Sequence, residues 1–181
     1  MRPSLLVFAL FLAACAPQKP LKVLGEVPEF ELVNQKGQKF TRTALDGHIW
    51  VADFIYTTCQ GPCPRMSSHM RALQKATDAG IRLVSFTVDP EHDNPEALAA
   101  YAKRFSADES RWSFLTGAKE TLNTLDRDAF KLGTIGAEMD HSTRFVLVDK
   151  KGRIRGYYGL AEGNPVDRIV KDAARLEKEQ G

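Results

Sequence analysis

The chain has 181 residues, of which 43% are hydrophobic and 27% are charged, and its net charge is +2 at pH 7. This length and composition are typical of one soluble globular domain with a hydrophobic core, and they argue against two domains. Lys and Arg residues are interspersed with Asp and Glu and form no basic tract. The sequence therefore gives no indication of a nucleic-acid partner.

The N-terminus has the features of an export signal. A positive Arg2 is followed by an apolar run of ten residues, Leu5–Ala14. A membrane-spanning helix needs about 20 apolar residues, so this run fits the core of a secretory signal peptide. The run ends in the letters LAAC, which look like the lipobox of a bacterial lipoprotein, and we expect Cys15 to be lipidated after cleavage. The alternative is an ordinary signal peptide cut near Ala14 or Ala16, which leaves Cys15 unmodified.

These N-terminal features predict the organisation and the location of the protein. We expect a signal peptide at 1–14, a lipidated N-terminus and tether at 15–27, and one domain at 28–181. The domain is then lipid-anchored on the extracytoplasmic side of a bacterial membrane, in the periplasm or at the cell surface, where disulfides can persist. Of the three cysteines, only Cys59 and Cys63 would carry free thiols in the mature chain.

Hydrophobic periodicity and turn signals predict alternating strands and helices in the first part of the domain. Asn94 is an expected N-cap, because Asn favours that position and Pro95 favours the first helical position after it. The two predicted strands after the hairpin are apolar runs, typical of a parallel sheet buried on both faces. The predicted elements are a β-hairpin over 29–45, a strand over 49–56, a helix that follows the cysteines and ends near Gly80, a strand over 81–89, and a helix from Pro95 to about Phe105.

The remaining elements predict an antiparallel end to the domain. They are a short strand over 112–116, a helix over 118–130, two strands over 143–149 and 153–159 joined as a hairpin, and a last helix opened by Asn164 and Pro165. Parallel βαβ units followed by an antiparallel hairpin form the thioredoxin pattern. We therefore predict an α/β, thioredoxin-like fold, with a central mixed β-sheet flanked by helices and an added N-terminal β-hairpin. An unspecified α/β sandwich is the alternative.

Cys59 and Cys63 lie four residues apart, where a predicted strand meets the following helix. Pro64 disfavours helical angles at Cys63 and suits the first helical position, so we expect the helix to begin at Pro64 with Cys63 near its N-cap. The free amides of a helix start favour an anion, which predicts a lowered pKa for a thiol there. The pair can form a redox-active disulfide, bind one metal or act as a structural crosslink. A crosslink across so short a loop adds little stability.

Four histidines are candidates for a third functional group. His48 follows a turn and His69 lies beside the apolar stripe of a helix, and both positions are typical of histidines without a special role. The carboxyl ends of parallel strands share one edge of a sheet, which brings the first cysteine near the loop that contains His92. A strand antiparallel to these begins at the same edge, and His141 lies just before such a strand. His141 is therefore the first candidate and His92 the second.

The choice of chemistry depends on the donor set and on a missing proline. Thioredoxin-type oxidoreductases place a cis-proline against their cysteines, but no proline occurs between Pro95 and Pro165, which argues against a general disulfide exchanger. Two cysteines and one histidine form a small, soft ligand set that suits copper or zinc. Zinc normally takes a fourth ligand or keeps an open catalytic position, so copper, as Cu(I) or Cu(II), is moderately favoured.

Three motifs occur in combination along the chain. They lie in the segments FIYTTCQGPCP, VSFTVDPEHDNPEALAAYAKRF and DHSTRFVLVDKKGRIRGYYG. Over about residues 27–175 the sequence resembles the Sco/SenC family of copper-binding cytochrome oxidase assembly factors. The insert QGP between the cysteines differs from the commoner P-D-[VI] of that family and leaves both cysteines in place.

The resemblance implies a thioredoxin-like domain anchored at the membrane, in which two cysteines and one histidine bind copper. These ligands carry over to Cys59, Cys63 and His141. It further implies that copper is delivered to the dinuclear copper site of cytochrome c oxidase subunit II, or that the cysteines of that site are reduced. The implied partners are subunit II or its assembly factors.

Two functions follow from these observations. The first is a membrane-anchored copper chaperone that transfers the metal by ligand exchange, and we expect it to act as a monomer. The second is a thiol–disulfide oxidoreductase, in which one cysteine of the redox-active pair Cys59 and Cys63 attacks a disulfide of a partner and the other resolves the product. The chain is expected to be mainly a metallochaperone, and an enzymatic activity is left open.

Overall fold

The computed structural model describes residues 19–132 and 143–180 of the chain. The predicted signal peptide, Cys15 and His141 lie outside the described residues. Cys59 and Cys63 lie within them, so the structure places the central motif directly.

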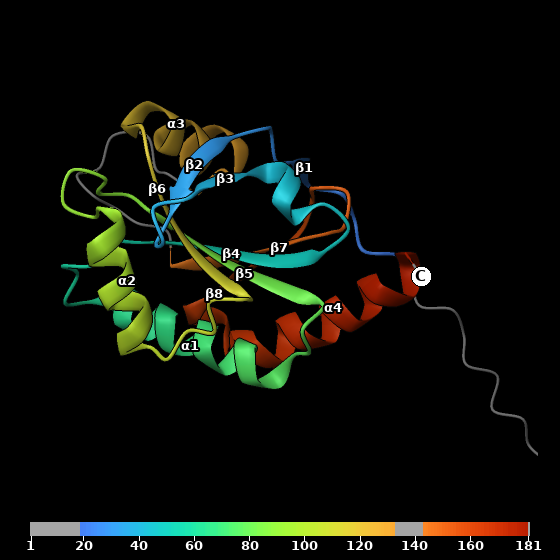
Figure 1. Cartoon of the computed structure of the whole chain (residues 1–181). Helices are drawn as coiled ribbons and strands as arrows, with labels where there is room; N and C mark the ends of the chain where they lie inside the picture. The colour runs from blue at the N-terminus through green and yellow to red at the C-terminus, as the bar shows by residue number, and fades with distance from the viewer. Residues whose placement is uncertain (1–18, 133–142, 181) are drawn as a thin grey trace, which may run out of the picture.

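A curled, mixed sheet of eight strands forms the centre of the described structure (Figure 1). The order across the sheet is β1-β8-β7-β4-β5-β6-β2-β3. Strands β4, β5 and β6 are parallel, and the other neighbouring pairs are antiparallel. The strands are β1 (Gly25–Glu26), β2 (Glu31–Asn34), β3 (Lys39–Thr41), β4 (Ile49–Ile55), β5 (Ile81–Thr87), β6 (Trp112–Thr116), β7 (Arg144–Val148) and β8 (Arg153–Gly159).

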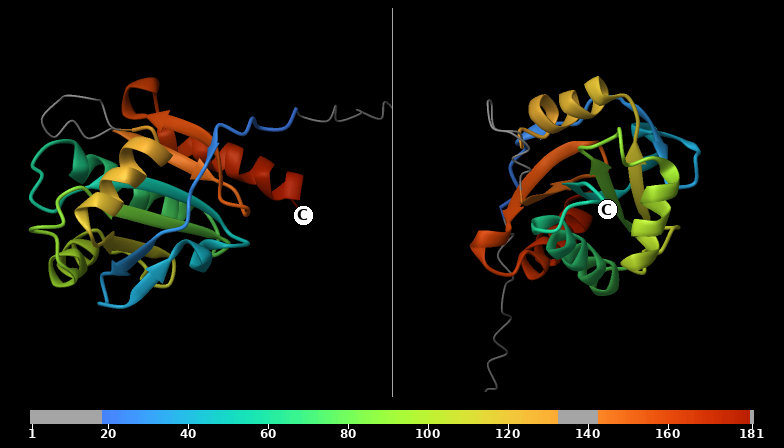
Figure 2. Two further views of the ribbon diagram at one scale, coloured as in Figure 1. Left: turned by 90° about the horizontal axis from the view of Figure 1, so that it is seen from above. Right: turned by 90° about the vertical axis from the view of Figure 1, so that its left-hand side faces the viewer.

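Helices cover both faces of the sheet. Figures 1 and 2 show α1, α2 and α4 on one side and α3 on the other. The α-helices are α1 (Pro62–Ala76), α2 (Pro95–Arg104), α3 (Lys119–Thr124) and α4 (Pro165–Gln180). Short 3₁₀ turns occupy Arg42–Leu45 and Leu160–Glu162, and a π-helical turn occupies Leu125–Ala129. Among the described residues, no helix has both the length and the hydropathy needed to cross a bilayer.

Strand β4 separates the two layers of the core, because its side chains point alternately to opposite faces of the sheet. Val51 and Ile55 pack with α1, α2 and α4, whereas Trp50 and Phe54 pack with α3 and the N-terminal hairpin. All seven residues of β4 are buried. Burial on both faces explains the near-continuous apolar sequence of this strand.

The predicted α/β architecture is confirmed, including the mixed central sheet, the flanking helices and the added N-terminal hairpin of β2 and β3. The predicted cap of α2 is also confirmed. The side chain of Asn94 accepts a hydrogen bond from the backbone N–H of Ala97 at 2.9 Å, and Pro95 is the first helical residue. The cap satisfies one of the amides that a helix start leaves unpaired.

One predicted helix boundary was wrong. Helix α1 begins at Pro62 rather than Pro64. The amides of the first turn have no partner within a helix, so a proline there loses no hydrogen bond and both prolines fit. The helix predicted over 118–130 is confirmed over 119–129, where α3 is followed by a π-helical turn. The N–H of Phe130 then bonds the carbonyl of Leu125 at 2.8 Å, the five-residue spacing of a π-helix.

The described part of the predicted tether, residues 19–27, lies against the domain. The guanidinium of Arg155 donates a hydrogen bond to the backbone carbonyl of Leu21 at 2.6 Å. The same guanidinium contacts the carboxylates of Asp149 and Glu179 at 2.8 and 2.6 Å, so its charge is compensated although only 6% of the residue is exposed. Strand β1 also pairs with β8. Residues 19–27 are therefore part of the packed structure.

Candidate metal centre

The two cysteines lie in contact at the edge of the sheet where β4 and β5 end. Cys59 lies in the turn after Ile55, the last residue of β4, and Cys63 is the second residue of α1. Both are free thiols, with 6% and 1% of their surfaces exposed. The thiol of Cys63 donates a hydrogen bond to the sulfur of Cys59. The short turn therefore brings the two sulfur atoms together, as the four-residue spacing of the cysteines predicted.

Polar groups converge on the sulfur of Cys59. Burial by itself raises the pKa of Cys59, but hydrogen bonds outweigh it and hold the pKa below its ordinary value. The donors are the thiol of Cys63, the backbone amides of Cys63 and Gly61, and the hydroxyl of Tyr56. The two amides belong to the start of α1, where unpaired N–H groups and the helix dipole favour a negative charge. Cys59 is therefore the thiol that ionises first.

Cys63 has the opposite character. Burial, and then the hydrogen bond that it donates to Cys59, raise the pKa of Cys63 well above its ordinary value. The backbone N–H of Tyr56 points to its sulfur and offsets this effect only in part. The sequence placed the lowered pKa at Cys63, and that prediction was wrong. Because α1 begins at Pro62, the amides of its first turn point back to the preceding turn and reach Cys59.

A buried carboxyl group, Asp93, joins the cysteine turn to the neighbouring loop. Asp93 lies between β5 and α2 and has no exposed surface. It accepts hydrogen bonds from the backbone N–H of Thr57 at 3.1 Å and from the hydroxyl of Thr57 at 2.5 Å. The hydroxyl of Thr87, at the end of β5, donates a further bond at 2.5 Å. These bonds hold the turn after β4 and the loop after β5 in one arrangement.

A second buried carboxyl group, Asp53, lies on β4. The alternation of the strand places it on the face that packs against α1. Ser85 donates a hydrogen bond to its Oδ1 at 2.6 Å, whereas Oδ2 has no hydrogen-bond partner among the described residues. Burial raises the pKa of Asp53 to about 7. The charge of Asp53 also contributes to the raised pKa of Cys63, so the two groups share one buried region.

The structure treats the two candidate histidines differently. His141, the first candidate, lies outside the described residues together with Asp140. His92, the second candidate, has a largely exposed side chain that pairs with Asp89 at 2.9 Å. Within 19–132 and 143–180, no three side chains of His, Cys, Asp or Glu come together as a metal-binding group. His92 therefore does not join the two cysteines in this arrangement.

The donor chemistry of the pair fits copper. Thiolates are soft ligands that suit Cu(I), and a metal must displace the thiol protons before it binds. Hydrogen-bond donors already stabilise Cys59 as a thiolate, and Cys63 lies in contact with it. A metal bound to both sulfurs requires the loss of the thiol protons, and Cys59 loses its proton more readily than Cys63 does.

A mixed sheet of thioredoxin-like topology, with two contacting thiols at the edge where its parallel strands end, defines a dithiol protein of the thioredoxin-like class. The model of the SCO1/SenC family matches residues 20–177. The chain therefore belongs to the SCO1/SenC family. A SCO1 protein homolog from Bacillus subtilis is 35% identical over 176 residues, which cover 90% of this chain and 89% of that relative.

Solved structures agree with this assignment. A SCO1/SenC family lipoprotein from Bacillus anthracis superposes with a TM-score of 0.80 at 35% identity, covering 88% of this chain and 99% of that one. BsSco, described as a member of the Sco family of cytochrome c oxidase assembly proteins with a disulfide switch, superposes with a TM-score of 0.78 at 33% identity, covering 89% and 99%. The predicted thioredoxin-like fold and the family resemblance are both confirmed.

Copper occurs in structures of this family. A copper-bound structure of ScoI from Bradyrhizobium japonicum superposes with a TM-score of 0.65 at 25% identity, covering 84% of this chain and 99% of that one. The predicted metal of the family is therefore copper, which agrees with the donor set formed by the two thiols.

Two residues near the thiols were not singled out from the sequence. Asp53 is the only charged residue in the run IWVADFIY. A carboxyl group in a strand predicted to be buried on both faces is a usable signal, because buried carboxyl groups are rare without a partner or a role. Tyr56 lies three residues before Cys59 and gives a weaker signal, since the direction of its hydroxyl depends on the turn that follows.

We expect Asp93→Ala to lower the free energy of unfolding by about 2–4 kcal/mol, because the donors of Thr57 and Thr87 become buried without an acceptor. Urea unfolding of the reduced protein, followed by tryptophan fluorescence, measures this loss. Asp89→Ala is the matched control, because Asp89 pairs with an exposed histidine and should cost less than about 0.5 kcal/mol. Equal losses in the two variants would contradict the role given to Asp93.

Asp53 predicts a pH-dependent stability. Its pKa is about 7 in the folded chain against an ordinary value of 3.8, so the folded state binds the proton more tightly. The free energy of unfolding should therefore fall as the pH rises from about 4 to about 7, by at most about 4 kcal/mol, and then level off. Asn cannot ionise, so Asp53→Asn should lack this fall. Urea unfolding over a pH series tests it, and parallel curves for the two proteins would exclude the assignment.

Proposed function

We propose that the protein is a membrane-anchored copper chaperone that delivers copper to the dinuclear copper site of cytochrome c oxidase subunit II. The observation that carries the proposal is the pair of contacting, buried thiols, of which Cys59 has a lowered pKa. We assign copper binding to Cys59, Cys63 and His141. The assignment of His141 rests on its place in the sequence, just before β7. The copper-bound Bradyrhizobium structure and the description of BsSco support the proposal.

In this proposal copper is the cargo, and the chain holds it and releases it. The Cys59 thiolate is the first ligand, because its hydrogen bonds already stabilise the negative charge. Cys63 then loses its proton as its sulfur binds. Cys59 is also the more exposed of the two cysteines. A thiolate of the acceptor therefore reaches the metal on the Cys59 side and takes it by ligand exchange.

A second function, reduction of cysteines in a partner, is favoured by the hydrogen bond between the two sulfurs. In this reaction the Cys59 thiolate attacks a disulfide of the partner and forms a mixed disulfide. Cys63 loses its proton and displaces the partner's thiolate, which leaves a Cys59–Cys63 disulfide and a reduced partner. The disulfide switch described for BsSco supports this chemistry.

Copper titration of the reduced full chain tests the first function. We expect one equivalent to bind, with absorption from thiolate-to-Cu(II) charge transfer. His141→Ala should weaken copper binding by about tenfold or more. Loss of a residue that only hydrogen-bonds to a metal ligand already lowers metal affinity by about that much, and loss of a ligand should cost at least the same. Either cysteine changed to Ser should abolish the absorption.

His92→Ala is the matched control and should bind copper as the wild type does. Absence of stoichiometric copper in the wild type, or unchanged binding by His141→Ala, would falsify the chaperone assignment. The same variant separates the two functions, because disulfide exchange needs only the cysteines. His141→Ala should keep its reaction with a disulfide partner if the protein acts as a reductase.

We further propose that Cys15 carries a lipid and anchors the chain to a membrane. The apolar run and the letters LAAC support this proposal, as does the relative from Bacillus anthracis that is described as a lipoprotein. Mass spectrometry of the wild type should show a lipid-modified N-terminal Cys15, and Cys15→Ser should lose its membrane fractionation. A Cys15→Ser protein that fractionates with membranes as the wild type does would rule out the anchor.

A further inference from the structure

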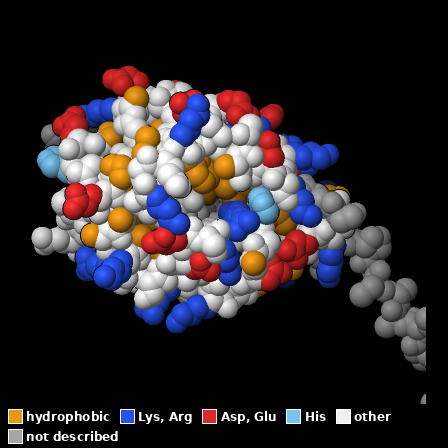
Figure 3. Space-filling view, viewed as in Figure 1, with side chains coloured by type: hydrophobic (Ala, Val, Ile, Leu, Met, Phe, Trp, Pro, Cys, Tyr) orange, Lys and Arg blue, Asp and Glu red, His pale blue; other side chains and the backbone are white. Residues whose placement is uncertain are grey.

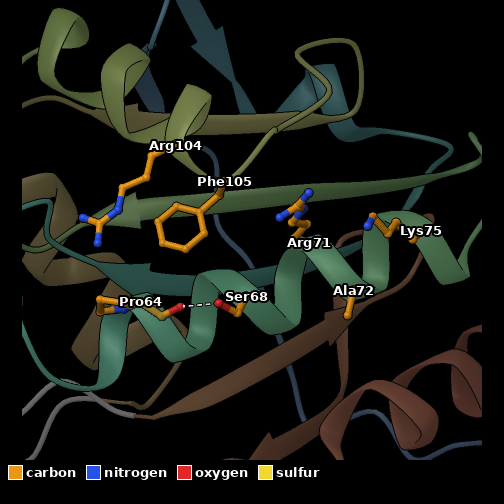
Figure 4. A pocket seen from close by; sticks show the side chains of 7 residues that line it. All are labelled: Pro64, Ser68, Arg71, Ala72, Lys75, Arg104 and Phe105. Carbon is orange, nitrogen blue, oxygen red and sulfur yellow. Dashed lines mark hydrogen bonds between the residues drawn. The ribbon is translucent and has the colours of Figure 1, made fainter.

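A groove with a volume of about 460 Å³ runs between α1 and the end of α2 (Figure 4). Helix α1 contributes Pro64, Ser68, Arg71 and Lys75 to it, and the end of α2 contributes Arg104 and Phe105. The ring of Phe105 points toward α1 and forms an apolar floor, because Phe105 is only 8% exposed. The guanidinium of Arg104 lies 5.6 Å from the centre of that ring. The groove therefore combines an apolar base with a cationic rim.

The charge of the groove is not compensated within the described part of the chain. Helix α1 contains no acidic residue. Arg71 and Lys75 on α1 and Arg104 on α2 are exposed, and none of them forms an ion pair with another described residue. Asp108, which follows α2, has its carboxylate hydrogen-bonded to the hydroxyl of Ser110 at 2.6 Å. Figure 3 shows Lys and Arg side chains gathered over the region of α1 and α2, at the lower left of that face. Among residues 19–132 and 143–180, the groove thus presents three cations that have no carboxylate partner.

The walls of the groove are fixed relative to each other. Between the two helices, the hydroxyls of Ser67 on α1 and Tyr101 on α2 are hydrogen-bonded at 3.0 Å, and both residues are buried. At the far end, the side chain of Gln74 bonds the carbonyl of Ser106 at 3.2 Å and the N–H of Asp108 at 2.7 Å. Because hydrogen bonds join α1 to the end of α2 at both places, the groove is formed before a ligand binds. Binding therefore does not lose the conformational entropy of ordering its walls.

The groove begins beside the thiols. Pro64 lies at one end and directly follows Cys63, whereas Lys75 lies near the other end of α1. At about 1.5 Å per residue, the two positions are about 16 Å apart along the helix. About five residues of extended chain span that distance. A segment lying in the groove would therefore end at the first turn of α1, which contains Cys63.

We propose that this groove docks an acidic, extended segment of the protein that exchanges copper or electrons with the thiols. Carboxylates of the segment pair with Arg71, Lys75 and Arg104, and an apolar side chain contacts Phe105. The docked segment places the partner's own thiols at the start of α1, where Cys59 is the more exposed of the two cysteines. This inference rests on the proposed function, and it adds the surface and the kind of segment through which the partner is recognised.

The observations favour a protein segment over a membrane surface as the occupant. The groove is a hollow between two helices, whereas a bilayer surface is broad and needs exposed apolar side chains to insert. In the described residues, the exposed large hydrophobic side chains are Val23 and Leu24, and neither lines the groove. Charge pairing in a preformed groove also gives the fast and salt-sensitive encounter that suits a carrier.

The experiment compares two charge-reversed proteins of equal net charge. One is Arg71→Glu with Lys75→Glu in the groove, and the other is Lys151→Glu with Lys171→Glu, two exposed lysines outside it. Each copper-loaded full chain, in detergent, is mixed with the copper-free, reduced copper domain of cytochrome c oxidase subunit II. The second-order rate of transfer is measured at low and high salt, and calorimetry measures binding of the copper-free chains to the same domain.

We expect the groove variant to transfer copper at least about tenfold more slowly at low salt and to bind the domain more weakly, with the difference shrinking at high salt. The control variant should match the wild type in both measurements. Both variants should bind one equivalent of copper, which shows that they fold and keep the thiol site.

Equal transfer and equal binding by the two variants would overturn the groove as a docking surface and leave the chaperone function intact. A wild type that binds copper and passes none to subunit II would instead refute the proposed function, and with it this occupant. A third outcome favours lipid. If the groove variant, made with Cys15→Ser, loses binding to phosphatidylglycerol vesicles while transfer is unchanged, the groove contacts the membrane and the proposal is overturned.

Discussion

The geometry of the thiol site depends on the buried carboxyl group of Asp93. Parallel pairing brings the ends of β4 and β5 to one edge of the sheet, but sheet hydrogen bonds do not extend into the turns beyond them. Asp93 binds Thr57 in one turn and Thr87 at the end of β5. A carboxyl group can be buried when its oxygens accept hydrogen bonds in this way. The turn after β4 is therefore held where the start of α1 meets the sulfur of Cys59.

The same turn gives the two thiols different properties. The amides of the first turn of α1 stabilise a thiolate at Cys59, whereas burial and the neighbouring charges oppose one at Cys63. Asp53, buried on the same side of the sheet, adds to that opposition. A site in which one ligand resists ionisation binds a metal less tightly than two preformed thiolates, because the second proton must be displaced. This asymmetry suits a protein that must hold a metal and also give it up.

The sequence predicted the order and type of most elements, because buried strands, caps and turns leave local signals. Asn94 and Pro95 are an example, since a cap depends on residues adjacent in the chain. The start of α1 was misplaced because the preference of Pro64 for a first helical position competes with that of Pro62, and only packing decides between them. The assignment of the lowered pKa failed for the same reason. The bonds between Asp93 and Thr57 join parts of the chain that are 36 residues apart, and no local pattern records their approach.

Helix α1 contributes to the thiol site, to the core and to the proposed docking groove, because its different faces contact different groups. Its first turn supplies amides to Cys59, its apolar stripe of Met66, Met70 and Leu73 packs into the core, and its exposed flank carries Arg71 and Lys75. A helix is rigid over this length, so a segment docked along the flank has a fixed position relative to the thiols. Recognition of a partner and exchange at the sulfurs are then coupled by geometry alone. No moving element is required between them, which places the specificity of transfer in the charges of one helix face.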